Sequence, residues 1–209
     1  MLLPQTEMTP DKKDCIDAMP SEAALSAMLR GQVAAVSAVQ QALPQIECGA
    51  TLVADTIRNG GTLVYTAAGS SGLMGLADGA ELPGTFGIPQ NQIRILMAGG
   101  VPIDGKMPGD TEDDDADALK LVEQLSTSDL LIMLSASGTT PYPCEIATHA
   151  RAKGIRIVAI ANNAGSTLLE LADVAIFLPT PPEVLAGSTR LGAGPAQKVT
   201  LNMMSTLAG

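Results

Sequence analysis

Five short apolar runs constrain the fold more than any other feature of this sequence. They are rich in Ile, Leu and Val, and each is bounded by Gly, Asp, Asn or Pro. The runs are Thr62–Ala67, Ile93–Met97, Leu130–Leu134, Ile155–Ala161 and Val174–Leu178. Stretches of helical composition lie between most of them, and strands that alternate with helices form a parallel sheet covered on both faces. The sequence therefore predicts an α/β fold of flavodoxin-like type, a three-layer sandwich with a parallel sheet of about five strands flanked by helices.

Helices are also expected on both sides of the strand region. Apolar residues recur at three- and four-residue steps from Leu25 to Leu43, which predicts a helix over 21–43 that Pro44 interrupts. A second helix follows and ends at Asn59-Gly60-Gly61, and a long helix is expected near Thr189–Leu207. Residues 1–14 are polar and uneven, so we expect a flexible arm there and a single domain over 15–209.

Charge and cysteine usage restrict the partners. The net charge is −10, which argues against nucleic acid and against an anionic membrane surface as partners. An anionic metabolite stays open, because backbone amides at helix N-termini bind phosphate without net positive charge. The first twenty residues lack the apolar stretch of a signal peptide, and the three scattered Cys indicate reduced thiols. We therefore expect a cytoplasmic protein, and with one His and no clustered ligands we expect no metal.

Two hydroxyl-rich loops follow the first and third predicted strands. In an open parallel sheet, ligands bind at the carboxyl ends of the strands, so these loops are the candidate site. Gly allows a ligand to approach the backbone, and Ser and Thr donate hydrogen bonds to phosphate oxygens. The alternative is ordinary helix capping by Ser and Thr, and neither loop matches a nucleotide-binding motif. The candidate phosphate-binding residues are Gly69, Ser70, Ser71, Ser135, Ser137, Gly138, Thr139 and Thr140.

Longer segments resemble one family. Asp78–Gly87 resembles the stretch D-A-S-E-C-P-P-T-F-G, Leu134–Tyr142 resembles A-A-S-G-R-T-P-Y, and Thr111–Asp114 is similar to an A-E-D loop. Pro182–Thr206 is similar almost residue by residue to the signature of the last helix. All four belong to the N-acetylmuramic acid 6-phosphate etherases, which with their relative the glucokinase regulatory protein have the sugar isomerase (SIS) fold. The resemblance runs from about Ile16 to the end of the chain.

The resemblance implies a carbon–oxygen lyase without a cofactor, acting on a phosphorylated amino sugar. Glu81 matches the family's acid, which protonates the departing D-lactate oxygen, and Glu112 matches its proposed base, which takes the proton at C2. From composition alone, Glu81 would be a solvated loop acid and Glu112 part of an acidic helix start. The residues next to Glu81, which are Leu82, Pro83 and Phe86, predict an apolar setting for its carboxyl group. Glu183 and Lys198 lie in the signature and are candidates for contact with the substrate, or alternatively for fixing the last helix or a subunit contact.

Three basic positions of the family are replaced, by Leu73, Thr139 and Gly192. The chain also stops soon after the signature, where the etherases carry a helical tail. Two other functions therefore stay open, a non-catalytic sugar-phosphate sensor like the regulatory relative and an aldose–ketose isomerase. The fold's relatives pair so that one subunit helps to complete the other's site, so we expect a homodimer.

Overall fold

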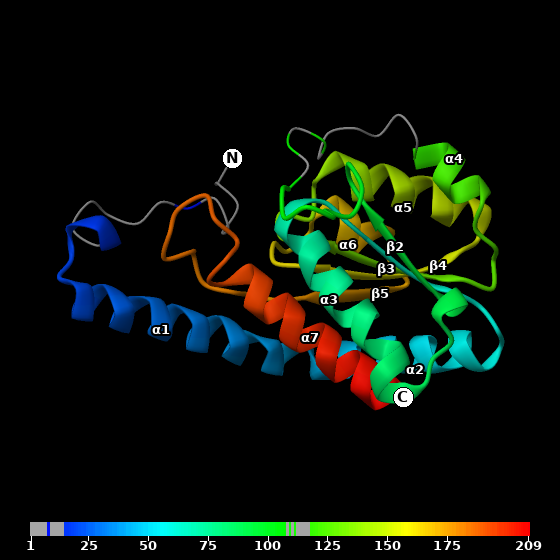
Figure 1. Cartoon of the computed structure of the whole chain (residues 1–209), viewed down its shortest axis with the longest axis horizontal. Coiled ribbons are helices and arrows are strands. Elements are labelled where there is room, and N and C mark those ends of the chain that lie inside the picture. Colours follow the sequence, from blue (N-terminus) through cyan, green and yellow to red (C-terminus); the bar gives the residue numbers. More distant parts are fainter. Residues whose placement is uncertain (1–7, 9–14, 108, 110, 112–117) are drawn as a thin grey trace.

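The five predicted strands form one parallel sheet in the computed structural model, which describes residues 8, 15–107, 109, 111 and 118–209 (Figure 1). Most of the predicted N-terminal arm, and Glu112, lie outside the described residues. The strands are β1 Leu63–Ala67, β2 Ile93–Met97, β3 Leu130–Ser135, β4 Arg156–Ala161 and β5 Val174–Phe177. Their order across the sheet is β2-β1-β3-β4-β5, and every neighbouring pair is parallel. The α/β prediction is confirmed, and each strand begins and ends within one residue of its predicted range.

Helices cover both faces of the sheet, so successive side chains of its central strands point alternately into two apolar layers. Helices α2 (Leu43–Arg58), α3 (Gly69–Phe86) and α7 (Ala193–Ala208) pack on one face, where Leu63 and Tyr65 point. Helices α4 (Ala118–Glu123), α5 (Pro141–Lys153) and α6 (Thr167–Leu171) pack on the other, where Val64 points. All strand residues of β3 are buried, as expected for a central parallel strand.

Helix α1 (Ser21–Ala38) extends away from the body of the molecule (Figure 1). Only its last part is buried, at Ala35 and Ala38, while apolar side chains along the rest of the helix are exposed. A 3₁₀ turn at Val39–Ala42 separates α1 from α2, where the sequence predicted one helix to Leu43. Pro44 is the second residue of α2, and it fits there because the first turn of a helix tolerates a residue without an N–H group.

Helix α3 includes the stretch Asp78–Phe86 that carries the family resemblance. It continues to Phe86 through Pro83 and ends at Gly87, whose φ of 70° is the left-handed conformation of a helix C-cap. Glu81 is therefore a helical residue and not a loop acid. Helix α7 begins at Ala193, four residues later than Thr189, because the preceding segment is held in a loop. Within the described residues, no helix is both long and apolar enough to cross a membrane.

Candidate functional site

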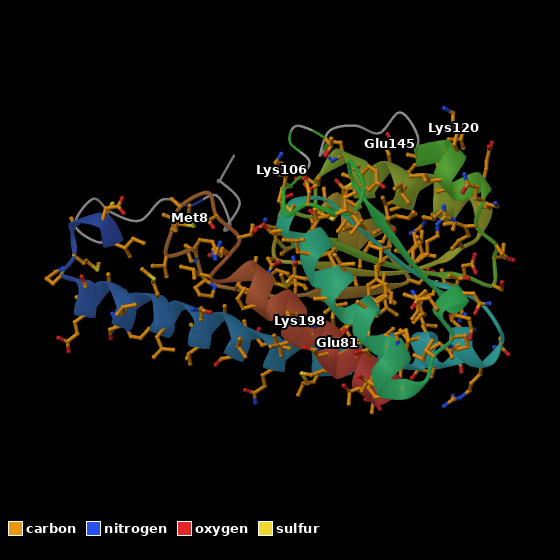
Figure 2. The ribbon with its side chains drawn as sticks, viewed as in Figure 1. Met8, Glu81, Lys106, Lys120, Glu145 and Lys198 are labelled. Carbon is orange, nitrogen blue, oxygen red and sulfur yellow. The ribbon has the colours of Figure 1, made fainter. Side chains whose placement is uncertain are left out.

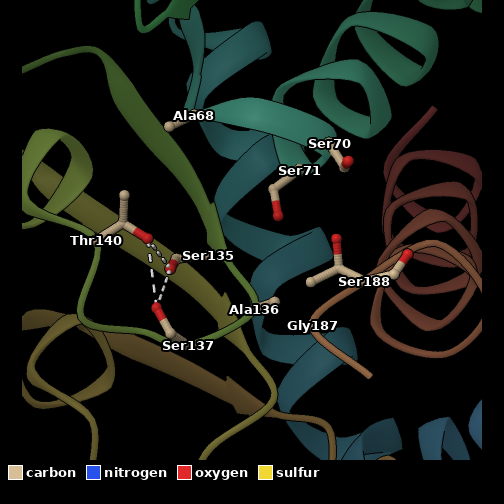
Figure 3. Close-up of a pocket in the computed structure, with 10 residues that line it drawn as sticks. Ala68, Ser70, Ser71, Ser135, Ala136, Ser137, Thr140, Gly187 and Ser188 are labelled. Atoms are coloured by element: carbon tan, nitrogen blue, oxygen red, sulfur yellow. Dashed lines mark hydrogen bonds between the residues drawn. The ribbon is translucent and has the colours of Figure 1, made fainter. Parts of the chain in front are cut away.

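A pocket of about 470 Å³ opens at the carboxyl ends of β1 and β3. These strands are neighbours, but the chain leaves β1 toward β2 at one edge and leaves β3 toward β4 at the other, so their loops diverge and leave a crevice. Three segments supply the walls, and Figure 3 shows their hydroxyl groups around the space. The lining residues are Ala68, Ser70, Ser71, Ser135, Ala136, Ser137, Thr140, Gly187, Ser188 and Thr189.

The loop after β3 is organised by its own hydroxyl groups. The Oγ atoms of Ser135 and Ser137 lie 2.8 Å and 3.3 Å from Thr140 Oγ1, and 3.3 Å from each other (Figure 3). The backbone N–H of Gly138 donates to Ser135 Oγ at 3.0 Å, and the N–H of Thr139 donates to Ser137 Oγ at 3.2 Å. The structure thus brings Ser135, Ser137 and Thr140 to the pocket as predicted, whereas Gly138 and Thr139 shape the loop behind it and are absent from the lining.

The loop after β1 supplies the N-terminus of α3. Gly69, the first residue of the helix, has a φ of 53°, and Ser70 and Ser71 follow it into the pocket lining. No side chain caps the first turn of α3, so its backbone amides are left for a ligand. Helix α5 also begins beside the pocket without a side-chain cap, but Pro141 and Pro143 lack N–H groups. The N-terminus of α3 is therefore a stronger anion-binding element than the N-terminus of α5, and its partial positive charge favours phosphate.

Sequence reasoning missed the third wall, Gly187-Ser188-Thr189. The segment follows β5 and carries the same combination of Gly, Ser and Thr as the two predicted loops, so the same argument identifies it. The segment lies far along the chain from β1 and β3, so the sequence did not indicate that it would line the same pocket. Figure 3 shows Ser188 across the pocket from the Ser135–Thr140 loop.

Glu183 binds the backbone between this third wall and α7. Its side chain is buried and accepts hydrogen bonds from the backbone N–H groups of Leu191 (3.3 Å), Gly192 (3.1 Å) and Ala193 (2.9 Å), at the start of α7. Burial raises the pKa of Glu183, and the three backbone hydrogen bonds oppose that shift. The structure thus places Glu183 as an anchor for α7 and not in the pocket lining. A Cβ at Gly192 would lie 2.9 Å from Glu183 Oε1, so the small residue lets this carboxylate approach the backbone.

Glu81 and Lys198 lie away from the pocket in the same chain. Glu81 is twelve residues after Gly69, which places it about 18 Å along α3 at about 1.5 Å per residue. Its side chain is 66% exposed, so the expectation of an apolar setting is wrong within the single chain. The carboxylate of Glu81 instead faces the ammonium group of Lys198 on α7, at 3.6 Å (Figure 2).

Comparisons with known proteins agree with the fold and the resemblance. The family model of the SIS domain matches residues 32–162. The chain is 39% identical over 202 residues to the N-acetylmuramic acid 6-phosphate etherase of Deinococcus radiodurans, covering 96% of this chain and 66% of the relative. It is 41% identical over 208 residues to that of Burkholderia lata, covering 97% and 67%. The chain therefore spans about two thirds of the length of these relatives.

Solved structures with lower sequence identity share the fold. A phosphoheptose isomerase from Francisella tularensis superposes with a TM-score of 0.62 at 16% identity, covering 91% of this chain and 97% of the other. The Vibrio vulnificus NanR protein complexed with ManNAc-6P superposes with a TM-score of 0.61 at 16% identity, covering 88% and 60%. At this identity the likeness concerns the fold alone.

Proposed function

Because this chain belongs to the SIS domain family and, within it, to the N-acetylmuramic acid 6-phosphate etherases, we propose that it cleaves the D-lactyl ether of N-acetylmuramic acid 6-phosphate by elimination and hydration. The observation that carries the proposal is the sequence identity of about 40% over nearly the whole chain, together with a hydroxyl-lined pocket of matching chemistry. The enzyme is then a carbon–oxygen lyase of amino sugar and peptidoglycan recycling.

The pocket is the proposed phosphate site. Ser135, Ser137 and Thr140 offer hydroxyl donors from one side, and Ser71 with the uncapped amides of α3 offers donors from the other. None of the residues in this lining is charged, so the dianion is held by hydroxyl and amide donors and by the end of the α3 dipole. The phosphate would fix the sugar so that its C2 and C3 atoms extend out of the crevice.

The two glutamates carry the proposed chemistry. Glu112 removes the proton at C2, which the open-chain aldehyde acidifies, and the electron pair forms the C2–C3 double bond as the C3–O bond breaks. Glu81 gives its proton to the lactyl oxygen, which leaves as D-lactate, and water then adds at C3. An acid and a base with different surroundings suit this pair of proton transfers. Glu112 lies outside the described residues, so its role follows from the family resemblance.

A homodimer reconciles the position of Glu81 with this mechanism. Within one chain Glu81 is too far along α3 to reach a sugar in the pocket at its start. We propose that each pocket receives Glu81 from the partner subunit. Helix α1 supports pairing, because Leu25, Leu29 and Val33 are 57–66% exposed on a helix that projects from the body. An apolar row of this kind marks a protein–protein contact.

The assay is release of D-lactate from N-acetylmuramic acid 6-phosphate, with sedimentation equilibrium for the assembly. The proposal expects lactate release from the parent chain, and a loss of about 10²–10⁴ in rate for Glu81→Gln. Leu29→Asp should convert the dimer to a monomer and remove activity. An inactive parent would contradict the proposed etherase activity. An active monomer would contradict the proposal that Glu81 acts in the partner's pocket.

A sugar-phosphate sensor is the alternative, favoured by one observation. The family's basic positions are Leu73, Thr139 and Gly192 here, and Thr139 lies outside the pocket lining. A chain that binds N-acetylmuramic acid 6-phosphate tightly in calorimetry but releases no lactate would support this function.

A further inference from the structure

The side chain of Asn163, just after β4, joins two backbone carbonyl groups of the loop after β3. Its Nδ2 atom donates to the carbonyl oxygen of Ala136 at 3.3 Å and to that of Ser137 at 3.3 Å. The backbone N–H of Asn162 also donates to the Ala136 carbonyl, at 3.0 Å. The segment after β4 therefore holds two successive carbonyl oxygens of a loop whose hydroxyl groups line the pocket.

The direction of each carbonyl fixes the direction of the N–H group in the same peptide. A trans peptide points its C=O and its N–H in opposite directions, and the described chain has no cis peptide. Strand β4 lies on one side of β3, and β1 lies on the other. Because the Ala136 carbonyl faces the β4 side, the N–H of Ser137 faces the β1 side, where the pocket opens. This N–H makes no hydrogen bond within the described residues, so a ligand can accept from it.

The next peptide has the same arrangement. Asn163 binds the Ser137 carbonyl, and the N–H of Gly138 in that peptide donates to Ser135 Oγ at 3.0 Å. This oxygen lies on the pocket side of the loop (Figure 3). Since it accepts a hydrogen bond from the backbone, its own O–H is left to donate to Thr140 or to a ligand. Both peptides held by Asn163 therefore direct donors toward the pocket.

Rotation of either peptide would reverse this arrangement. The carbonyl oxygen of Ala136 or Ser137 would then face the pocket, where it would repel the oxygens of a phosphate. Within the described part of the chain, Asn163 is the one side chain that donates to these two carbonyls. It is absent from the pocket lining, so any effect on a ligand passes through the loop.

We propose that Asn163 is a positioning residue for the phosphate group: its amide keeps the carbonyls of Ala136 and Ser137 turned toward β4, so that the loop presents donors to the anion. The inference rests on the proposed function, in which this pocket holds the phosphate of N-acetylmuramic acid 6-phosphate. It adds to that function a residue that neither touches the substrate nor takes part in the proton transfers.

Asn163→Leu removes the amide and keeps a side chain of similar size. The phosphate group should bind about tenfold more weakly, which corresponds to the loss of one hydrogen bond to a charged group. The phosphate lies away from the reacting C2 and C3 atoms, so KM should rise by this factor while kcat changes little. Inorganic phosphate should lose the same factor as a competitive inhibitor. N-Acetylmuramic acid, which lacks the phosphate, should inhibit the variant and the parent equally.

Gln92→Leu is the matched control. Gln92 Nε2 also joins two backbone carbonyls, those of Ile57 at 3.1 Å and Gly61 at 2.9 Å. Gln92 precedes β2 at the amino end of the sheet, whereas the pocket lies at the carboxyl end. The control therefore loses the same kind of hydrogen bonds and should lower the unfolding midpoint, with KM and inhibition by phosphate at the parent's values.

The experiment measures KM and kcat for lactate release and the two inhibition constants, together with the unfolding midpoint, in the parent and both variants. An increase in KM and in the inhibition constant of inorganic phosphate that is confined to Asn163→Leu supports the inference. Three results overturn it and leave the etherase function standing: an unchanged KM in folded Asn163→Leu, a loss in kcat alone, or equal changes in Gln92→Leu.

Failure of the proposed function is a separate outcome. If the parent binds N-acetylmuramic acid 6-phosphate without releasing lactate, the proposed reaction fails, and calorimetric affinities for this compound and for inorganic phosphate decide the inference by the same comparison. A parent that binds neither compound overturns both the phosphate site and the inference. If Asn163→Leu does not fold, Asn163→Ala decides, because it removes the amide without adding an apolar branch.

Discussion

The hydroxyl oxygens of Ser135 and Thr140 lie 2.8 Å apart, and this hydrogen bond draws the end of β3 and the start of α5 together. Ser137 lies 3.3 Å from both hydroxyls and completes the cluster. The cluster places three hydroxyl groups on one side of the pocket, where an anion could replace part of their mutual hydrogen bonding.

The double substitution Ser135→Ala with Ser137→Ala removes two of these donors. We expect affinity for N-acetylmuramic acid 6-phosphate to fall by about 2–3 kcal/mol, at about 1–1.5 kcal/mol per lost hydrogen bond. Calorimetric titration measures this. Thr148→Ala is the control, since its hydroxyl bonds the backbone of α5 outside the pocket. Unchanged affinity in the double variant would show that the phosphate binds elsewhere.

Gly138 combines a left-handed backbone with a close neighbour. Its φ is 71°, and a Cβ there would meet the side chain of Ser166. The left-handed conformation alone costs a residue with a Cβ about 1–2 kcal/mol. Gly138→Ala should therefore lower the free energy of unfolding by more than this amount, because the Cβ also meets Ser166. Gly154→Ala isolates that backbone cost, because Gly154 has a φ of 77° and open space around it. Equal losses in chemical denaturation would show that Ser166 simply moves aside.

The pH dependence of stability should report on Glu183. Its pKa is raised in the folded chain from the ordinary value of 4.5, so the folded state binds this proton more tightly than the unfolded state. The group's contribution to stability is then complete below pH 4.5 and is lost as the pH rises through the raised folded value. The stability of the parent relative to Glu183→Gln should fall over that window in urea denaturation. If the difference in unfolding free energy between the parent and Glu183→Gln stayed constant across pH, the raised pKa of Glu183 would be contradicted.

Mixed dimers test whether Glu81 acts across the subunit boundary. At substrate concentrations too low to fill the weakened pocket, Glu81→Gln and the Ser135→Ala/Ser137→Ala chain should each have little activity. Together they form mixed dimers with one complete site. Random pairing predicts about a quarter of the parent's rate of lactate release, since about half of the dimers are mixed and each holds one site of two.

The arrangement of the two lesions supplies the control for this experiment. When all three substitutions are in one chain and the other is unaltered, the mixed dimers should be inactive, because each site carries one lesion. The unaltered homodimers in this second mixture supply about a quarter of the parent's rate by themselves. About half of the parent's rate in the second mixture, with none in the first, would place Glu81 in the same chain as its pocket.

Local sequence patterns determined that the strands form a parallel sheet, that helices alternate with them along the chain, and which residues form two of the pocket walls. Buried parallel strands such as β3 must be continuous apolar runs, and Gly and hydroxyl residues must follow them wherever a ligand meets the carboxyl edge. These requirements act within about ten neighbouring residues, so they can be read without the fold. The resemblance to the etherases likewise rested on contiguous segments.

Only the tertiary structure decided which groups Glu183, Asp78 and Lys198 contact and where Glu81 lies. Asp78 lies 124 residues from Asn202 and 127 from Ser205, both of which bind it, and no periodicity in the chain encodes that meeting. Whether a carboxylate is buried, paired or exposed depends on which helix packs against it. The sequence therefore determined which residues lie at the carboxyl ends of the strands. The packing of α3 on α7 decided which charged groups lie close to one another.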